Sequence, residues 1–302
     1  MILTVTPNIA LDITYHIERL TPHTSTRVSD VKDRAGGKGI NVARVLHSLG
    51  HESMAVGFAG GTVGAQIRED LDAAGLRYQL LPIMGQTRRS VSIVDATDAT
   101  VLNEAGPEVT KHEWAALVAM VTELIKQASV LVVSGSLPPG VAADGVADLV
   151  SVAVAADTPV IADSSGDALL AATAAGPTLI KPNGPEIVAA TGIDDPMAAA
   201  RALMADGAGE VALSLGAEGL CLLSGEGALV AAPSRVVAGN PTGAGDAAVA
   251  ALALGLAEGW GARRMVGEAV ALSAAAVAHP LAGGFDPEVY REMLESVEVK
   301  ER

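Results

Sequence analysis

Short Val- and Ile-rich runs alternate with longer Ala- and Leu-rich segments along most of this chain, and this alternation constrains the fold more than any other feature. Continuous apolar runs are typical of strands buried on both faces of a parallel sheet, and the longer segments then supply the crossover helices. The pattern therefore predicts a three-layer α/β/α architecture with a mainly parallel central sheet. The expected strands are residues 2–6, 53–60, 130–135, 159–163, 178–183 and 210–216. The expected helices are residues 39–50, 111–128, 144–157 and 195–207, and 243–297 is mostly helical.

Two segments interrupt this rhythm. Residues 11–34 and 87–103 alternate polar and apolar side chains without a helical period, and turn-forming Asp, Ala and Thr stand at the centre of the second. Such alternation predicts antiparallel strands with one polar face, which we interpret as a small β-sheet lid made of two insertions. Ordinary hairpins at the edge of the main sheet are the alternative. The length of 302 residues suits a single domain, residues 1–302, that includes the lid.

Charge and composition narrow the class of partner. The formal net charge is -15, with 35 acidic against 20 basic residues, which argues against a nucleic-acid partner. A small anionic substrate remains compatible, because a local pocket can be basic on an acidic protein. Apolar stretches are broken before they reach membrane-spanning length, so we expect no membrane partner. The single cysteine, Cys221, cannot form an internal disulfide, and we expect a cytoplasmic protein.

The most informative short segment is the turn Gly243-Ala244-Gly245 followed by Asp246, which opens an apolar helix. Small residues leave the backbone N–H groups at a helix start unshielded, and the helix dipole adds partial positive charge there. Such a start stabilises an anion, typically phosphate. A carboxylate beside it suggests a general base for an attacking hydroxyl. The alternative is an ordinary helix N-terminus with a favourable acidic residue in its first turn.

A second Gly-rich turn, Gly36-Gly37-Lys38-Gly39, also enters a helix. It lacks the spacing of a Walker phosphate loop. Strand 2–6 does not lead directly into it, so it is not a dinucleotide fingerprint either, which speaks against a nicotinamide dehydrogenase. Two helix starts that suit anions, one near each end of the chain, fit an enzyme that handles two ligands.

In the segments that contain these two turns, the chain resembles the PfkB branch of the ribokinase-like sugar kinases. The resemblance is carried by "AGGKGINVAR" near the N-terminus and "NPTGAGDA" near the C-terminus. It covers nearly the whole chain, and within the family it is closest to the 1-phosphofructokinase and tagatose-6-phosphate kinase branch. The segments between the two turns, in the family's order, are "SGSLPPG" (134–140), "DSSG" (163–166), "KPNGPE" (181–186) and "SLGAEG" (214–219).

The resemblance implies roles on the nucleotide side of a site that uses ATP and Mg²⁺. It makes Gly243, Ala244 and Gly245 an anion hole for the transferred phosphoryl group and Asp246 the catalytic base. Asn183 and Glu186 would organise Mg²⁺, largely through water, because this ion usually keeps several of its water ligands. From the residues alone, the pair is more simply interpreted as an Asn turn followed by a helix-start Glu, and Lys181 can be a plain surface lysine. The residues implied in nucleotide binding are Lys181, Asn183, Ser214, Gly216 and Gly219.

On the sugar side, the resemblance implies that Asp12 binds sugar hydroxyls and that Gly36, Gly37 and Asn41 form the sugar-binding turn. Lys38, Arg27 and Arg88 would favour a sugar that already carries a phosphate, since the guanidinium fork suits phosphate oxygens. Lid arginines can also be plain solvated strand residues, as Arg34 and Arg89 nearby illustrate.

The sequence departs from the family pattern in three places, one of which is the entry "NPT" (240–242) in place of the more frequent "ST" or "NT". Ala247 stands where relatives often carry Ser, and Ser25 stands where some phosphofructokinases carry a phosphate-binding Lys. The expected activity is ATP-dependent phosphorylation of a phosphorylated ketohexose to a bisphosphate, with fructose 1-phosphate, tagatose 6-phosphate and fructose 6-phosphate as candidates. A kinase of an unphosphorylated sugar or nucleoside and a non-catalytic sugar-phosphate sensor are the alternatives. Apolar alternation in the lid predicts a homodimer joined through it.

Overall fold

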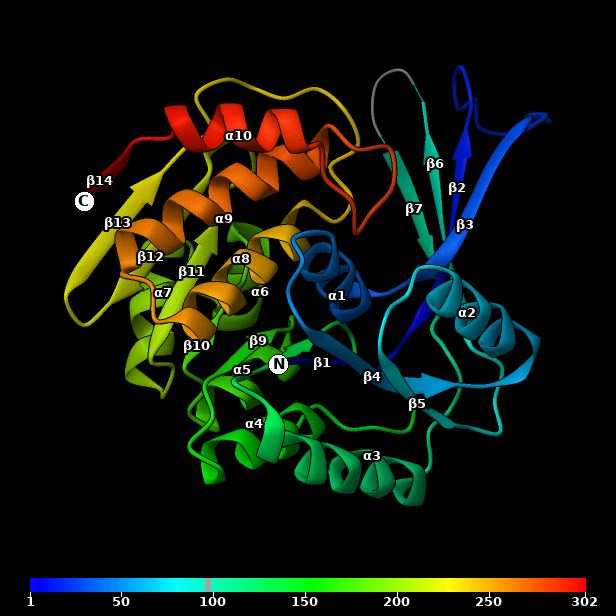
Figure 1. Ribbon diagram of the computed structural model, residues 1–302, viewed down its shortest axis with the longest axis horizontal. Helices are drawn as coiled ribbons and strands as arrows, with labels where there is room; N and C mark the ends of the chain where they lie inside the picture. The colour runs from blue at the N-terminus through cyan, green and yellow to red at the C-terminus, as the bar shows by residue number, and fades with distance from the viewer. Residues whose placement is uncertain (96–98) are drawn as a thin grey trace.

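The computed structural model describes residues 1–95 and 99–302. Within these residues the main sheet has ten strands in the order β14-β13-β12-β11-β10-β9-β8-β1-β4-β5 (Figure 1). All neighbours from β5 to β11 pair in parallel, and only β12, β13 and β14 pair antiparallel at one edge. The predicted mainly parallel sheet is confirmed. Its strands are β1 (Ile2–Thr6), β4 (Ser53–Ala59), β5 (Tyr78–Pro82), β8 (Val130–Ser134), β9 (Val160–Asp163), β10 (Leu179–Ile180), β11 (Glu210–Ser214), β12 (Leu220–Ser224), β13 (Gly227–Ala231) and β14 (Val299–Glu301).

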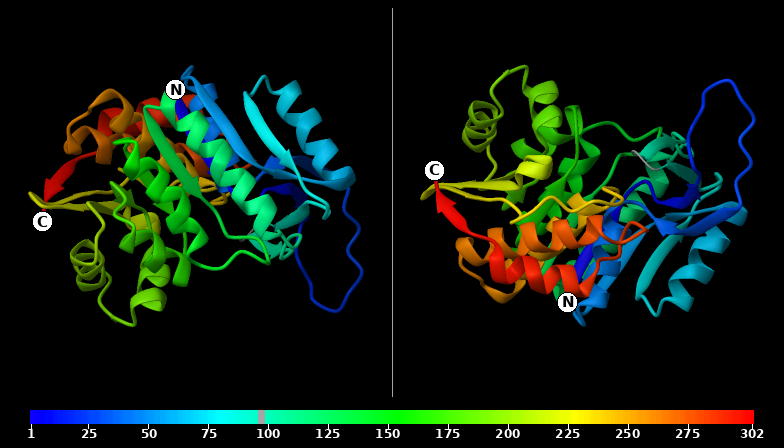
Figure 2. Two further views of the ribbon diagram at one scale, coloured as in Figure 1. Left: turned by 90° about the horizontal axis from the view of Figure 1, so that it is seen from below. Right: turned by 90° about the horizontal axis from the view of Figure 1, so that it is seen from above.

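Helices cover both faces of this sheet, so the three-layer prediction is also confirmed (Figure 2). Alternate residues of one strand point to opposite layers: Leu131 and Val133 of β8 pack into one core, and Val130 and Val132 into the other. One face carries α3 (Lys111–Leu124), which ends in the 3₁₀ turn η1 (Ile125–Gln127), then α4 (Gly145–Ala155), α5 (Asp167–Ala174), α6 (Gly184–Thr191) and α7 (Pro196–Ala205). The other carries α1 (Lys38–Ser48), α2 (Gly61–Ala73), α8 (Ala244–Glu258), α9 (Ala262–Val277) and α10 (Pro287–Ser296).

Several elements were not predicted from the sequence. Strands β5 and β12 to β14, and helices α2 and α5, were not anticipated, and of α6 only the start was. The expected strand 178–183 is short, because β10 ends at Ile180 and the chain then turns into α6. Residues 181–183 therefore lie just beyond the carboxyl end of a buried strand, where side chains can reach a site. Among the described residues, no helix is both long and apolar enough to cross a bilayer.

The lid is a separate four-stranded sheet in the order β3-β2-β6-β7, which extends from the body at the upper right of Figure 1. Its strands are β2 (Ala10–His16), β3 (Asp30–Gly36), β6 (Arg88–Val94) and β7 (Ala99–Asn103). The turn expected at the centre of the second insertion falls on residues 96–98, outside the described residues.

The expectation that the lid is antiparallel was wrong in one respect. The pairs β2–β3 and β6–β7 are antiparallel, but β2 and β6 pair in parallel. The reason lies in the main sheet. Strands β1 and β5 run in the same direction there, and each leads into the lid from its carboxyl end. Strands β2 and β6, which follow them, therefore enter the lid in the same direction.

Candidate active site

A cleft of about 1000 Å³ opens where the carboxyl ends of the parallel strands, the lid and the N-terminus of α8 meet. The carboxyl edge of an open parallel sheet is the usual place for a ligand site. Single ligands commonly occupy ~300–1,000 Å³, so the cleft is large enough for two small substrates.

The N-terminus of α8 forms one wall of the cleft. Gly243 caps the helix with a φ of 87°, a left-handed conformation that glycine adopts without strain. The N–H of Ala244 donates to the carbonyl of Pro241, but among the described residues the amides of Gly245 and Asp246 have no acceptor. A Cβ built on Gly245 would lie 3.5 Å from the Lys181 ammonium nitrogen. Two open amides, a helix dipole and a cation therefore meet at one point, as an anion requires.

Asp246 lies in the first turn of α8 and is 6% exposed. Its Oδ2 accepts a hydrogen bond of 2.8 Å from the side-chain amide of Asn41. Burial raises the pKa of Asp246 to about 6, because it outweighs the opposing effects of Lys38, Asn41 and Lys181, and Asp163 raises it further. A general base works best when it is ionised at neutral pH and its pKa lies only a little below that pH, as for this carboxylate.

Two lysines converge on one buried carboxylate beside this helix. Lys38 Nζ donates to Asp163 Oδ1 at 3.1 Å, and Lys181 Nζ lies 3.5 Å from the same oxygen. Ser134 donates to the other oxygen, Oδ2, at 3.0 Å. Burial alone would raise the pKa of Asp163, but the two ammonium groups and the hydrogen bonds outweigh it, so this pKa lies below its ordinary value. Asp163 in turn is the main reason that the pKa of Lys38 lies above its ordinary value.

The lid side of the cleft carries Asp12 and Arg88. Gly36 lies so close to Asp12 that an added Cβ would stand 1.9 Å from Asp12 Oδ2. Burial, followed by the negative charge of Asp246, raises the pKa of Asp12 to about 7 against the opposing charge of Arg88. Arg88 donates from Nε to the Asn8 carbonyl at 3.1 Å and from Nη1 to the Glu104 carbonyl at 3.3 Å. These bonds fix its guanidinium and leave Nη2 without an acceptor among the described residues.

Asn183 and Glu186 form a reciprocal capping box at the start of α6. The Glu186 N–H donates to Asn183 Oδ1 at 2.8 Å, and the Asn183 N–H donates to Glu186 Oε2 at 2.9 Å. This is the helix-start arrangement that the residues alone allowed. Both side chains also line the cleft, and Glu186 Oε1 has no partner among the described residues. One free carboxylate oxygen on a side chain that lines the cleft fits Mg²⁺, which keeps most of its waters. The metal role of the pair stays a prediction.

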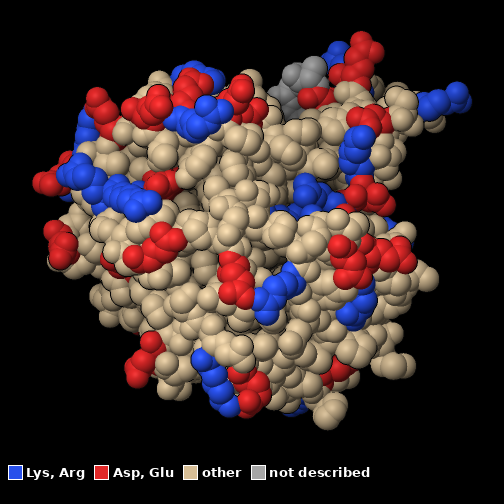
Figure 3. Space-filling model, in the orientation of Figure 1, with Lys and Arg blue, Asp and Glu red and all other residues tan. Residues whose placement is uncertain are grey.

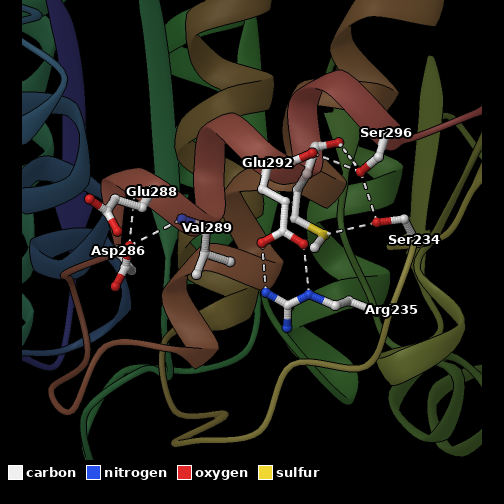
Figure 4. A network of polar contacts seen from close by, with 8 residues as sticks. Ser234, Arg235, Asp286, Glu288, Val289, Glu292 and Ser296 are labelled. Atoms are coloured by element: carbon white, nitrogen blue, oxygen red, sulfur yellow. Dashed lines mark hydrogen bonds and ion pairs between the residues drawn. The ribbon is translucent and has the colours of Figure 1, made fainter.

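A mostly apolar wall completes the far end of the cleft, opposite the lid. Ser214, Gly216 and Gly219 line it, together with the apolar residues Pro233, Val236, Val237, Val270 and Val277. Residues 232–239, which include Pro233, Val236 and Val237, are held against α10 by polar contacts. Arg235 pairs with Glu292 through two bonds of 2.7 Å, and the hydroxyls of Ser234 and Ser296 lie 2.8 Å apart (Figure 4). An apolar slot of this kind suits the flat base of a nucleotide.

The structure brings most of the predicted residues together, with one clear exception. Arg27 lies on the exposed connection between β2 and β3 and is not among the described residues that line the cleft. Gly36 contributes by its contact with Asp12 and does not line the cleft itself. Sequence reasoning gave no role to Asn8, Ser134 or Asp163. Asp163 could have been found, because it closes a predicted strand whose carboxyl end points to the site.

The charged surface around this region is mixed. On the face shown in Figure 3, the Lys and Arg side chains of the described residues are interspersed with Asp and Glu and form no continuous patch. The basic groups of the site, Lys38, Lys181 and Arg88, instead line the cleft. The positive charge of the site is therefore local and suits a small anion.

Comparison with known proteins agrees with this geometry. Residues 6–288 match the model of the pfkB family carbohydrate kinases. Phosphofructokinase-2 from Escherichia coli, solved in complex with potassium, is 30% identical with a TM-score of 0.90, over 97% of this chain and 98% of that one. A Thermotoga maritima protein described as a possible 1-phosphofructokinase is 26% identical with a TM-score of 0.90, over 100% and 99%.

A third solved structure supports the fold alone. Arabidopsis thaliana ribokinase, complexed with ribose and ATP, is 20% identical with a TM-score of 0.74, over 97% of this chain and 98% of that one. The ribokinase-like fold predicted from the sequence is confirmed. This chain belongs to the pfkB family of carbohydrate kinases and is a phosphotransferase that acts on a sugar.

Proposed function

We propose that this chain transfers the terminal phosphoryl group of ATP to a hydroxyl of a phosphorylated ketohexose and so forms a bisphosphate. One observation carries the proposal. A buried carboxylate, Asp246, lies beside open helix amides and two ammonium groups, and a fixed arginine, Arg88, lines the lid side of the same cleft. The first set suits phosphoryl transfer, and the second suits a phosphate already present on the acceptor.

The residues divide the work of the transfer. Asp246 takes the proton of the acceptor hydroxyl while the hydroxyl oxygen bonds to the terminal phosphorus and the bond from that phosphorus to the ADP oxygen breaks. The amides of Gly245 and Asp246, with Lys181, stabilise the negative charge on the transferred group. Asp12 orients the sugar hydroxyls. Mg²⁺, held by Glu186 through water, would neutralise charge on the nucleotide phosphates. Closure of the lid would exclude water.

A substrate panel tests the proposal. Purified chain is assayed with ATP, Mg²⁺ and fructose 1-phosphate, fructose 6-phosphate, tagatose 6-phosphate or the free hexoses. We expect kcat/KM for one of the phosphorylated sugars to exceed that for its free hexose by about 10²-fold, since charge-assisted hydrogen bonds to a phosphate are worth about 1.5–3 kcal/mol each. Equal turnover of free and phosphorylated sugars would favour the free-sugar kinase, and binding without turnover would favour the sensor.

Arg88→Ala separates the two ends of the cleft. We expect the KM for the sugar phosphate to rise about 10- to 100-fold while the KM for ATP stays within about twofold, because one charge-assisted donor to the phosphate is lost. Arg89→Ala is the matched control on the same strand and should change neither constant. An unchanged KM for the sugar phosphate in Arg88→Ala would mean that the phosphate lies elsewhere.

The rate should fall in acid. Asp246 accepts a proton only when it is ionised, and its pKa lies at about 6. With the sugar phosphate well below its KM, kcat/KM, which reports the pKa values of the free enzyme, is therefore expected to fall at least tenfold per pH unit below about pH 6. The pH profile of kcat/KM measures this directly. A rate that stays constant down to pH 5 would contradict a role for Asp246 as base.

The assembly and the location of the chain stay predictions. The lid strands expose Val31 and Leu102 on one face, and these residues are 52% and 58% exposed. A second lid packed against them would remove this apolar surface from water, which supports the homodimer proposed from the sequence. One of the similar solved structures is described as the tetrameric inhibited form of Escherichia coli phosphofructokinase-2.

A further inference from the structure

Asp163 is the most deeply buried charged group of the cleft, and the transfer described above assigns it no step. Its side chain is 1% exposed, at the carboxyl end of β9. Two of its side-chain partners line the cleft, Lys38 from the start of α1 and Lys181 from the turn after β10, and Ser134 at the end of β8 is buried beside them. A carboxylate that served only stability would not need two partners that both face the substrate.

The two lysines need a partner of this kind. Lys38 and Lys181 bring two positive charges to one oxygen of Asp163, within 3.1 and 3.5 Å. Without a carboxylate between them they would repel each other, and each flexible stem could turn away. Lys181 also lies against Gly245, so its position decides where positive charge stands at the start of α8.

We propose that Asp163 is a positioning residue for phosphoryl transfer, which acts by holding the ammonium groups of Lys38 and Lys181 together beside the N-terminus of α8. The inference rests on the proposed function. It assigns Asp163 no contact with substrate and no proton transfer. Its charge also acts on the base, because Asp163 opposes Lys38 and Lys181 in setting how readily Asp246 ionises.

The pH profile of Asp163→Asn distinguishes this role from a merely structural one. The charged and titratable groups that face Asp246 are Lys38 on α1, Lys181 after β10, Asp163 on β9 and Asp12 on the lid. Lys38 lowers the pKa of Asp246 more than Asp163 raises it, so release of the two lysines in Asp163→Asn raises this pKa. We expect kcat to drop roughly 10- to 100-fold, as for other lost electrostatic groups, and the acid limb of kcat/KM to move up by about half a pH unit or more.

Partial unfolding lowers the amount of active enzyme but cannot move the limb, so an acid limb that stays in place or moves down overturns the proposal. Asp148→Asn is the matched control. Asp148 accepts a hydrogen bond from Trp114 between α3 and α4, away from the cleft, and its replacement should leave the limb unmoved. Wild-type chain runs in the same assay. If it phosphorylates no sugar of the panel, the proposed function fails, whereas an active wild type with an unmoved limb in Asp163→Asn refutes only the inference.

A double-mutant cycle with Lys38→Met tests the route. If Asp163 acts through the lysines, Asp163→Asn should cost at least threefold less in kcat in the Lys38→Met background than in the wild type. Equal losses in both backgrounds would overturn the proposal. If Asp163→Asn does not fold, Ser134→Ala replaces it in the cycle, since it removes only the hydrogen bond to Oδ2. Ser134→Ala should lower kcat a few-fold in the wild-type background and not at all in the Lys38→Met background. An equal decrease of kcat in both backgrounds would contradict an action of Asp163 through the lysines.

Discussion

Replacement of Asp246 by Asn is expected to lower kcat by about 10³- to 10⁴-fold, the upper part of the range for loss of a general base. The amide has nearly the shape of the carboxylate and can still accept the hydrogen bond from Asn41, so the helix start should keep its geometry. It cannot take the proton of the acceptor hydroxyl. Initial rates at saturating substrates measure the effect, and calorimetry should still detect nucleotide binding.

The control for this variant is Asp206→Asn, an exposed residue at the end of α7 that lies outside the cleft. Its kcat should equal that of the wild type. A rate within tenfold of the wild type in Asp246→Asn would remove Asp246 from the role of base. The sensor alternative would fail as well, because a protein that only binds shows no rate of transfer.

Gly36→Ala is expected to have the second largest effect, although it adds a single methyl group. The new Cβ would stand 1.9 Å from Asp12 Oδ2 and 2.1 Å from its Cγ, so the carboxylate must swing out of its position. If Asp12 orients the sugar, kcat/KM for the sugar phosphate should fall about 10²-fold, since misplaced substrate groups typically cost that much. The KM for ATP should stay within about twofold.

Gly267→Ala provides the matched glycine control on α9. An added Cβ there meets its nearest neighbour, the Val299 Cγ2, at 3.6 Å, which is ordinary contact. Its kinetic constants should therefore be those of the wild type. A normal kcat/KM in Gly36→Ala, with the variant folded by circular dichroism, would show that the position of Asp12 does not matter for the sugar.

The sequence was most informative where structure depends on neighbouring residues. The Val- and Ile-rich runs identify β1, β4, β8, β9 and β11, because a buried strand needs apolar side chains on both faces. Gly243 marks the start of α8, since its left-handed conformation favours glycine. The bonds between Asn183 and Glu186 span three residues, and the helix-start interpretation of that pair needed nothing beyond the local pattern.

Polar contacts between distant segments were beyond such reasoning. The bond from Asn41 to Asp246 joins residues 205 apart, and the bond from Lys38 to Asp163 joins residues 125 apart. The motif resemblance placed Asn41, Lys38 and Asp246 in one site, but it did not show which of them touch. It gave Asp163 no role, and it grouped Arg27 with Arg88 although only Arg88 lines the cleft.

The sequence by itself thus determined most of the buried parallel strands, the helix starts open to an anion and the family, because periodicity, glycine geometry and capping act over a few residues. The tertiary structure decided that β2 and β6 run in parallel, that Asp163 lies between two lysines and that Asn41 holds the base. Those contacts depend on the order of the strands in the sheet and on the edge from which each loop leaves. Both are set by the packing of the whole core, which no short stretch of sequence encodes.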